Sequence, residues 1–144
     1  MLQRSLAAAL ASIAITLSAH AQAMGQFIDI FPKTEDDIRL ILSTLDEAIN
    51  STEASGPPIV MMLHGPQADR FLRSSYAHNK MLVDQTAKLA AYGVLEVQIC
   101  ETWLRRNKHS HEELFPFVAP VPFGRDVLTR LAEEEGYEEL SVDL

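Results

Sequence analysis

The residue best suited to chemistry in this sequence is Cys100, the only cysteine of the chain. It follows a largely apolar, β-branched stretch at 94–99 and precedes a charged segment that favours a helix. This pattern predicts a buried strand that ends at a helix N-terminus, where free amides and the helix dipole stabilise a thiolate. Such a thiolate can attack a sulfur atom. The position equally suits an inert core residue, because free cysteines are often buried.

A second candidate group lies after the continuous apolar stretch 59–63, where the chain reads His64-Gly65-Pro66. His64 can act as a base or bind a sulfur-bound group, and Gly65 lets the backbone approach a ligand or adopt a positive φ. The alternative is a histidine in a loop that Gly65 and Pro66 simply shape.

Three further candidates for binding, Glu101, Thr102 and Arg105, follow Cys100 directly. Amides near the start of this segment and the positive charge of Arg105 favour an anionic sulfur, whereas the carboxylate of Glu101 acts in the opposite sense. We therefore predict a site that centres on Cys100 and includes these residues.

A metal site is an alternative, because His109 and His111 stand close to Glu112 and Glu113. Zinc sites usually take ligands from a second element too, and a solvated, charged loop explains the pattern more simply. The sequence has no G-x-G-x-x-G fingerprint, no phosphate-binding loop and no G-x-S-x-G elbow. We predict neither a metal nor a cofactor.

The elements that position these residues alternate between strands and helices along the chain. Strands are expected at 27–31, 117–121 and 137–142, and Pro120 favours an edge or irregular position for the second of these. Thr34 is the predicted N-cap of a helix, and the polar segment 74–79 is a predicted loop. Short apolar stretches alternate with amphipathic ones, which predicts right-handed crossovers and a parallel sheet covered on both faces. The expected fold is α/β, a flavodoxin-like three-layer α/β/α sandwich with a mainly parallel sheet of about five strands. Cys100 and His64-Gly65 would then lie at the carboxyl edge of the sheet, where such folds bind ligands.

The N-terminal segment 1–23 reads as a cleavable signal peptide, with a basic start, an apolar stretch and small residues around Ala21 and Ala23. The apolar stretch is too short to span a membrane. We predict a periplasmic protein with one domain at 24–144. The formal net charge of −8 at pH 7 argues against nucleic acid as a partner. A single cysteine excludes an internal disulfide.

The stretches 59–66 and 89–94, then Ile99-Cys100-Glu101-Thr102, resemble in order and spacing the DsrE/DsrF-like sulfur-relay family. The segment 114–122 and the ending Glu135-Gly136-Tyr137 also fit, so the resemblance covers about residues 27–140. The chain departs from the family pattern in two ways. After the cysteine it has Arg106-Asn107-Lys108-His109 in place of an Arg-Gly-Ile-like turn, and it is predicted to be exported. The resemblance implies an α/β/α sandwich that assembles as a homo-oligomer, a trimer or hexamer, with Cys100 at the carrier position.

Our leading hypothesis is therefore a periplasmic carrier that binds sulfane sulfur as a persulfide on Cys100 and passes it to a partner protein. Such a protein is a sulfurtransferase-like carrier at most. One alternative is an oligomeric module that binds a small ligand or a protein and in which Cys100 is structural. The other is a metal-binding protein that uses His109 and His111.

Overall fold

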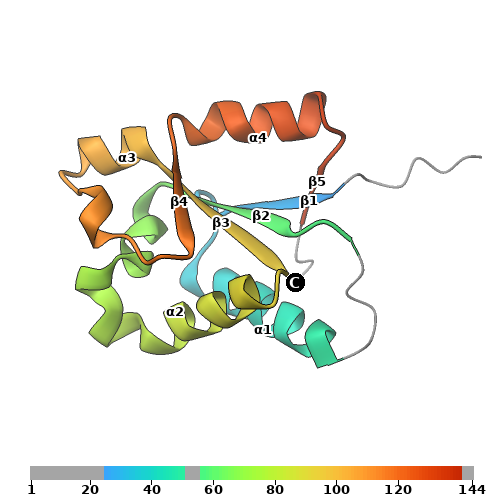
Figure 1. Ribbon diagram of the computed structural model, residues 1–144, viewed down its shortest axis with the longest axis horizontal. Coiled ribbons are helices and arrows are strands. Elements are labelled where there is room, and N and C mark those ends of the chain that lie inside the picture. The colour runs from blue at the N-terminus through green and yellow to red at the C-terminus, as the bar shows by residue number, and fades with distance from the viewer. Residues whose placement is uncertain (1–24, 51–55, 141–144) are drawn as a thin grey trace, which may run out of the picture.

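A parallel five-stranded sheet forms the centre of the protein, in the order β4–β3–β2–β1–β5 (Figure 1). The computed structural model describes residues 25–50 and 56–140, so the predicted signal peptide lies outside the described residues. The strands are β1 (Gln26–Asp29), β2 (Ile59–Leu63), β3 (Leu95–Cys100), β4 (Val118–Val121) and β5 (Glu138–Glu139). The α-helices are α1 (Glu35–Asn50), α2 (Tyr76–Ala91), α3 (Glu101–Arg106) and α4 (Gly124–Glu133). Three short 3₁₀ turns are η1 (Pro66–Phe71), η2 (Arg73–Ser75) and η3 (His111–Glu113).

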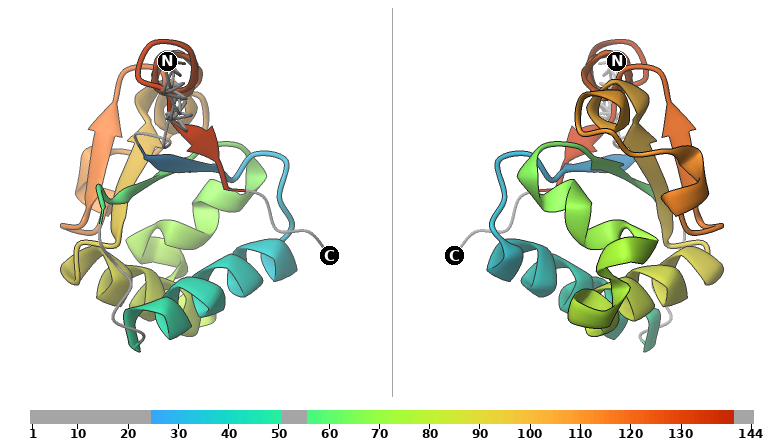
Figure 2. Two further views of the ribbon diagram at one scale, coloured as in Figure 1. Left: turned by 90° about the vertical axis from the view of Figure 1, so that its right-hand side faces the viewer. Right: turned by 90° about the vertical axis from the view of Figure 1, so that its left-hand side faces the viewer.

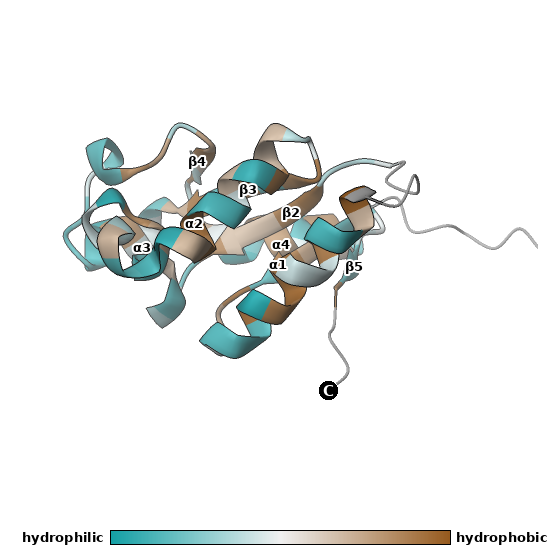
Figure 3. Cartoon of the chain, turned by 90° about the horizontal axis from the view of Figure 1, so that it is seen from below, coloured by the Kyte–Doolittle hydropathy of each residue, from teal (hydrophilic) through white to brown (hydrophobic). Residues whose placement is uncertain are grey.

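Helices cover both faces of the sheet, which confirms the predicted α/β fold (Figures 1 and 2). Helices α1 and α2 pack on one face, where the larger core includes Ile28, Met61, Val97 and Ile99. Helix α4 packs on the other face and buries Leu128 and Leu131 against the first two strands. Figure 3 shows hydrophilic and hydrophobic stretches following one another along α1 and α2, as expected of helices with one buried side. We refer to the two sides of the sheet as the α1–α2 face and the α4 face.

The start of α1 follows from its polar residues. The Thr34 hydroxyl accepts a hydrogen bond from the Asp37 amide at 3.2 Å, and the Asp37 carboxylate accepts one from the Thr34 amide at 2.7 Å. This reciprocal cap satisfies amides that the helix leaves free, and the acidic first turn complements the helix dipole. It confirms Thr34 as the predicted cap and fixes where the chain turns after β1.

The alternation of side chains along the strands decides which residues face α4. In β3, Val97 and Ile99 belong to the core on the α1–α2 face, so Glu96, Gln98 and Cys100 point to the α4 face. The uninterrupted apolar sequence of β2 reflects its central position, since both of its faces are covered. The sequence pattern therefore directs Cys100 toward α4.

One predicted loop is helical instead. The polar segment 74–79 was expected to be a loop, but η2 and the first turn of α2 occupy it. Two of its side chains donate hydrogen bonds: the Asn79 side-chain amide donates to the Ser75 backbone carbonyl at 3.1 Å, and the Tyr76 hydroxyl donates to the Asp84 carboxylate at 2.7 Å. These bonds stabilise a helix in a segment whose polar composition suggested a loop. Asn79 retains a non-helical backbone and marks a kink.

The ends of the sheet also differ from expectation. We predicted strands at 27–31 and 137–142. Strand β1 ends at Asp29 and β5 is Glu138–Glu139, and residues 141–142 of the second prediction lie outside the described residues. The Asp29 carboxylate accepts a hydrogen bond from the Phe31 amide at 2.9 Å, which turns the chain away from the sheet. Strand β4 lies at the sheet edge, as predicted from Pro120. Within 25–50 and 56–140, no helix is long and apolar enough to cross a membrane.

Candidate functional site

Cys100 ends β3 and directly precedes α3 on the α4 face of the sheet. Cys100 is 4% exposed and pairs in register with Val121 of β4. A Cβ atom added to Gly124, the first residue of α4, would lie 3.2 Å from the Cys100 Cβ and 2.7 Å from the Met62 sulfur. The absence of a side chain at Gly124 thus lets α4 begin directly over the cysteine.

The segments that follow β3 and β4 diverge at Cys100. Leu104 of α3 packs into the core on the α1–α2 face, whereas α4 covers the opposite face. Open α/β sheets bind ligands beyond the strand ends at places where successive connections change sides. The predicted location of the site at the carboxyl edge is therefore consistent with the topology around Cys100.

His64 follows β2 at the same edge. Its Nε2 lies 2.6 Å from Oδ1 of Asp29, and its ring centroid lies 5.5 Å from that of Phe31. The His64 side chain is 15% exposed. These contacts hold the imidazole in one orientation, with one nitrogen engaged by a carboxylate and one ring face against an aromatic side chain.

His64 and Cys100 are neighbours in register but are not hydrogen-bonded. Leu63 pairs with Ile99, and His64 and Cys100 each follow that pair, on adjacent strands and the same face. The His64 ring bonds to Asp29 of β1, which flanks β2 on the side away from β3. The structure therefore brings the two predicted residues to neighbouring positions and directs the imidazole away from the thiol.

Gly65 has the backbone conformation that the sequence indicated. Its φ of 73° and ψ of −168° lie in a region that is essentially restricted to glycine. An added Cβ would lie 2.3 Å from a ring carbon of Phe31. Gly65 is thus required both for the turn into η1 and for the position of Phe31 against His64.

The other three predicted binding residues join α3 to its surroundings. The Thr102 hydroxyl donates to the Pro122 carbonyl at 3.0 Å, and Arg105 donates to the same hydroxyl at 3.1 Å. Glu101 lies 3.1 Å from Nε2 of His111 and 3.8 Å from Arg105. This network ties α3 to the loop that precedes α4 and so helps to fix the walls around Cys100.

The two histidines of the metal alternative have separate partners. His109 lies 3.1 Å from both Glu113 and Asp69 and stacks on Trp103 with ring centroids 5.6 Å apart. His111 instead pairs with Glu101. In the described part of the chain, no three His, Cys, Asp or Glu side chains are grouped so that they could hold a metal ion.

Asp29 is a site residue that we did not predict. Burial raises its pKa, but hydrogen bonds from His64 and the Phe31 amide and the positive charges of His64 and Lys33 outweigh this effect. The pKa of Asp29 is consequently below its ordinary value. The signal in the sequence was its place near the end of the first strand, where it alternates with apolar residues.

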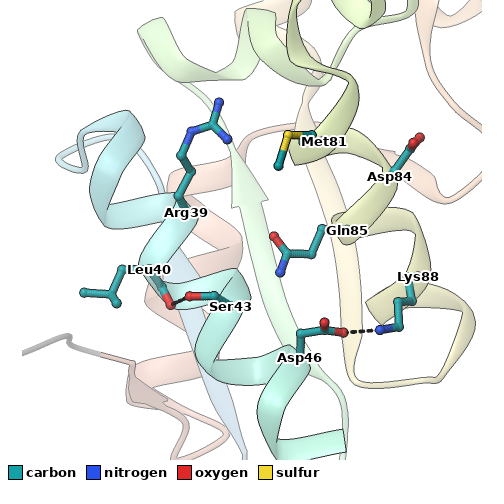
Figure 4. Close-up of a pocket in the computed structure, with 8 residues that line it drawn as sticks. All are labelled: Arg39, Leu40, Ser43, Asp46, Met81, Asp84, Gln85 and Lys88. Atoms are coloured by element: carbon teal, nitrogen blue, oxygen red, sulfur yellow. Dashed lines mark hydrogen bonds and ion pairs between the residues drawn. The ribbon is translucent and has the colours of Figure 1, made fainter.

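A shallow groove of about 320 Å³ lies between α4 and the strands β1 and β5. Asp29 and His64 line its floor, and Arg125, Thr129 and Glu133 of α4 line its wall. A larger hollow of about 790 Å³ lies between α1 and α2 (Figure 4), where Lys88 bonds to Asp46 at 2.5 Å. The larger hollow is on the α1–α2 face, away from Cys100, so the smaller groove is the one that adjoins the candidate site.

We predict that Asp29→Asn reduces stability mainly above the pKa of Asp29. A carboxyl group whose pKa is lowered by folding stabilises the native state above its unfolded value of 3.8, and this contribution is lost as the pH falls through the lower folded value. The variant should lose about 1–2 kcal/mol at pH 7, because a charge-assisted hydrogen bond is weakened. Urea unfolding at pH 7 and pH 3 tests this. An equal loss at both values would contradict it.

Comparison with known proteins supports the fold of the chain and does not indicate its function. No family model and no curated protein matches the chain. Among solved structures, the chain is similar to MTH1491 from Methanobacterium thermoautotrophicum, a protein of unknown function, with 20% sequence identity and a TM-score of 0.58. The match covers 80% of this chain and 96% of that one. The likeness shows the fold. This structural neighbour therefore supports the α/β architecture over most of the chain.

Proposed function

We propose that the protein is a sulfur carrier that holds sulfane sulfur as a persulfide on Cys100. The observation that carries this proposal is the location of Cys100 at the carboxyl end of β3, where α4 begins directly over it and His64 occupies the neighbouring register position. The resemblance to sulfur-relay proteins assigns the same residue. We also propose, from the N-terminal sequence and that resemblance, that the protein acts in the periplasm as a homo-oligomer.

The chemistry requires only thiol–disulfide exchange. The Cys100 thiolate attacks the outer sulfur of a persulfide or polysulfide donor, and the donor leaves as a thiolate of one sulfur fewer. An acceptor thiolate then attacks the outer sulfur on Cys100 and removes it. Cys100 directly precedes α3 and lies close to Gly124, the first residue of α4, and the amides at a helix start favour an anionic group. A partner protein that donates or accepts the sulfur is compatible with this scheme.

Intact-mass spectrometry tests the proposal. After exposure to inorganic polysulfide, the protein should gain one sulfur that maps to Cys100 and disappears on reduction. Unmodified Cys100 in folded protein would contradict the carrier function.

The burial of Cys100 favours one second candidate, a binding module in which the cysteine is structural. Only 4% of the residue is exposed, as is typical of a packed core position. In that case a small thiol reagent should leave Cys100 unmodified in the native protein and react with it after unfolding. Modification of the native protein at a rate well above global unfolding would contradict the structural role.

A further inference from the structure

Both ring nitrogens of His109 lie against carboxylates. Its Nδ1 is 3.1 Å and 3.2 Å from the two carboxylate oxygens of Glu113 in η3, and its Nε2 is 3.1 Å from Oδ1 of Asp69 in η1. Among the described residues, His64 and His111 instead pair with a single carboxylate each. The surroundings of His109 therefore differ from those of the other two paired histidines.

These contacts require a positively charged ring. A neutral imidazole has one N–H and one nitrogen with a lone pair, so it donates to one carboxylate and presents the lone pair to the other. The imidazolium donates from both nitrogens. His109 also stacks on the indole of Trp103 in α3, with ring centroids 5.6 Å and planes 21° apart, an arrangement that favours a cation. The protonated ring thus joins η1, η3 and α3.

The two carboxylates that face His109 are not held equally. Glu113 accepts a hydrogen bond from the Ser110 amide at 2.8 Å, and this bond, together with the one from His109, holds the pKa of Glu113 below its ordinary value. The Glu113 side chain is 32% exposed, whereas that of Asp69 is 57% exposed. A neutral ring is therefore expected to keep its bond to Glu113 and to lose the one to Asp69.

The turn that carries His109 is strained. The His109 amide donates to the Leu104 carbonyl at 2.9 Å, and the Lys108 amide donates to the Arg105 carbonyl at 3.3 Å, which is a Schellman ending of α3. Lys108 has a φ of 61°, in the left-handed region where this motif usually has glycine or asparagine. Contacts elsewhere must offset the cost of this conformation, and the bond of His109 to Asp69 is one of them.

We propose that His109 is a pH-sensitive latch that fastens α3 and the segment 107–113 to η1. The imidazolium holds Asp69, and the neutral ring releases it as the pH rises through the range in which histidines titrate. Because the ion pairs exist only while the ring is protonated, their stabilising contribution is present at low pH and is lost as the pH rises. The latch is independent of sulfur chemistry and goes beyond the proposed function.

A second histidine of the same segment has to be separated from the latch. His111 lies 3.1 Å from Glu101 of α3, and Glu101 lies 3.8 Å from Arg105. The charge of His111 therefore also influences α3. One neutral tautomer of His111 can donate to Glu101, so this pair does not require a positive ring. Substitution of His111 is consequently the matched control for substitution of His109.

The fluorescence of Trp103 tests the latch, because it is the only tryptophan of the chain. A stacked imidazolium quenches an indole more strongly than a neutral imidazole does, so the emission should rise as the pH is raised from 5.5 to 8.5. His109→Gln should remove this rise, and His111→Gln should retain it. Emission that does not change with pH, or that changes equally in His109→Gln, would overturn the proposal.

The variant Asp69→Asn tests the release of η1 and does not depend on how well His109→Gln folds. Measured by urea unfolding, it should lower the equilibrium constant for folding about threefold at pH 5.5 and change it little at pH 8.5, as expected of an exposed ion pair. Asp126→Asn removes an exposed carboxylate from α4 and controls for net charge. A loss from Asp69→Asn that is as large at pH 8.5 as at pH 5.5 would overturn the latch.

Access to Cys100 links the latch to the proposed function, on which this last expectation rests. Cys100 is 4% exposed and directly precedes α3, so a reagent reaches its thiol only when a neighbouring segment moves. An aromatic disulfide reagent should modify His109→Gln about threefold faster than the native protein at pH 5.5 and equally fast at pH 8.5. Comparison at one pH cancels the ionisation of the thiol.

The two readouts separate the latch from the carrier function. A pH response of Trp103 that depends on His109, in a protein whose Cys100 never gains sulfur from polysulfide, supports the latch and overturns the carrier. Loading of Cys100 with sulfur, in a protein whose Trp103 emission does not change with pH, supports the carrier and overturns the latch.

Discussion

Replacing Cys100 with serine is expected to abolish sulfur loading while the fold is retained. The sulfur acceptor is lost, and the sequence contains no second cysteine. The substitution places a hydroxyl in a buried position, which should cost about 1–2 kcal/mol of stability, well within what a folded domain tolerates. Intact mass after polysulfide treatment measures the loading, and circular dichroism with thermal unfolding measures the fold.

A matched control moves the thiol instead of removing it. Ser74 is exposed in the turn before α2, so the double variant Cys100→Ser with Ser74→Cys has one thiol away from the candidate site. It should react with polysulfide only as a free thiol does and lose the added sulfur rapidly to small thiols. Loading as fast and as persistent as that of the native protein would show that the surroundings of Cys100 contribute nothing.

Gly65→Ala is expected to have the largest effect on the structure of the site. Alanine at φ 73° and ψ −168° is strained, and its Cβ would lie 2.3 Å from a ring carbon of Phe31. We expect a loss of about 2–3 kcal/mol in the free energy of unfolding. Phe31 is 54% exposed, so its ring can be displaced into solvent, away from His64. Urea unfolding measures the loss, and the imidazole proton resonances of His64 report the displacement.

Gly93→Ala is the matched control for this variant. Gly93 ends α2 with a similar φ of 72°, but an added Cβ would meet no atom within 4 Å. Only the backbone cost of about 1 kcal/mol is expected, with no change in the resonances of His64. If the two alanine variants lost the same stability and left His64 unchanged, the close approach of Gly65 to Phe31 would have no structural importance.

The sequence predicted the fold because its local patterns agree with its packing. The apolar stretch 59–63 is a central strand, and Thr34 caps α1 as expected. Prediction was weaker where tertiary contacts decide the structure. The segment 74–79 is helical with support from hydrogen bonds that the Asn79 and Tyr76 side chains donate, and β1 is shortened by the bond of Asp29 to the Phe31 amide. Neither interaction has a distinct sequence signature.

The candidate site was predicted in position but not in its contacts. Cys100 and His64 could be placed at one edge because parallel strands end together. The partner of His64 depends on strand order, which the sequence does not encode locally, and Asp29 was therefore missed. Thr102 and Arg105 were predicted to bind a ligand, but their contacts in the fold were not predicted: Thr102 donates to the Pro122 carbonyl before α4, and Arg105 donates to the Thr102 hydroxyl. Such long-range pairings are visible only in the assembled sheet.

The most direct test of the carrier function is to follow one sulfur atom on to Cys100 and off again. Protein loaded with isotopically labelled sulfane sulfur is freed of donor and mixed with an acceptor thiol, and the masses of both are followed with time. We predict that the label leaves Cys100 and appears on the acceptor as a persulfide in equal amount. Label that never reaches Cys100, or that stays there in the presence of excess acceptor, would contradict the account.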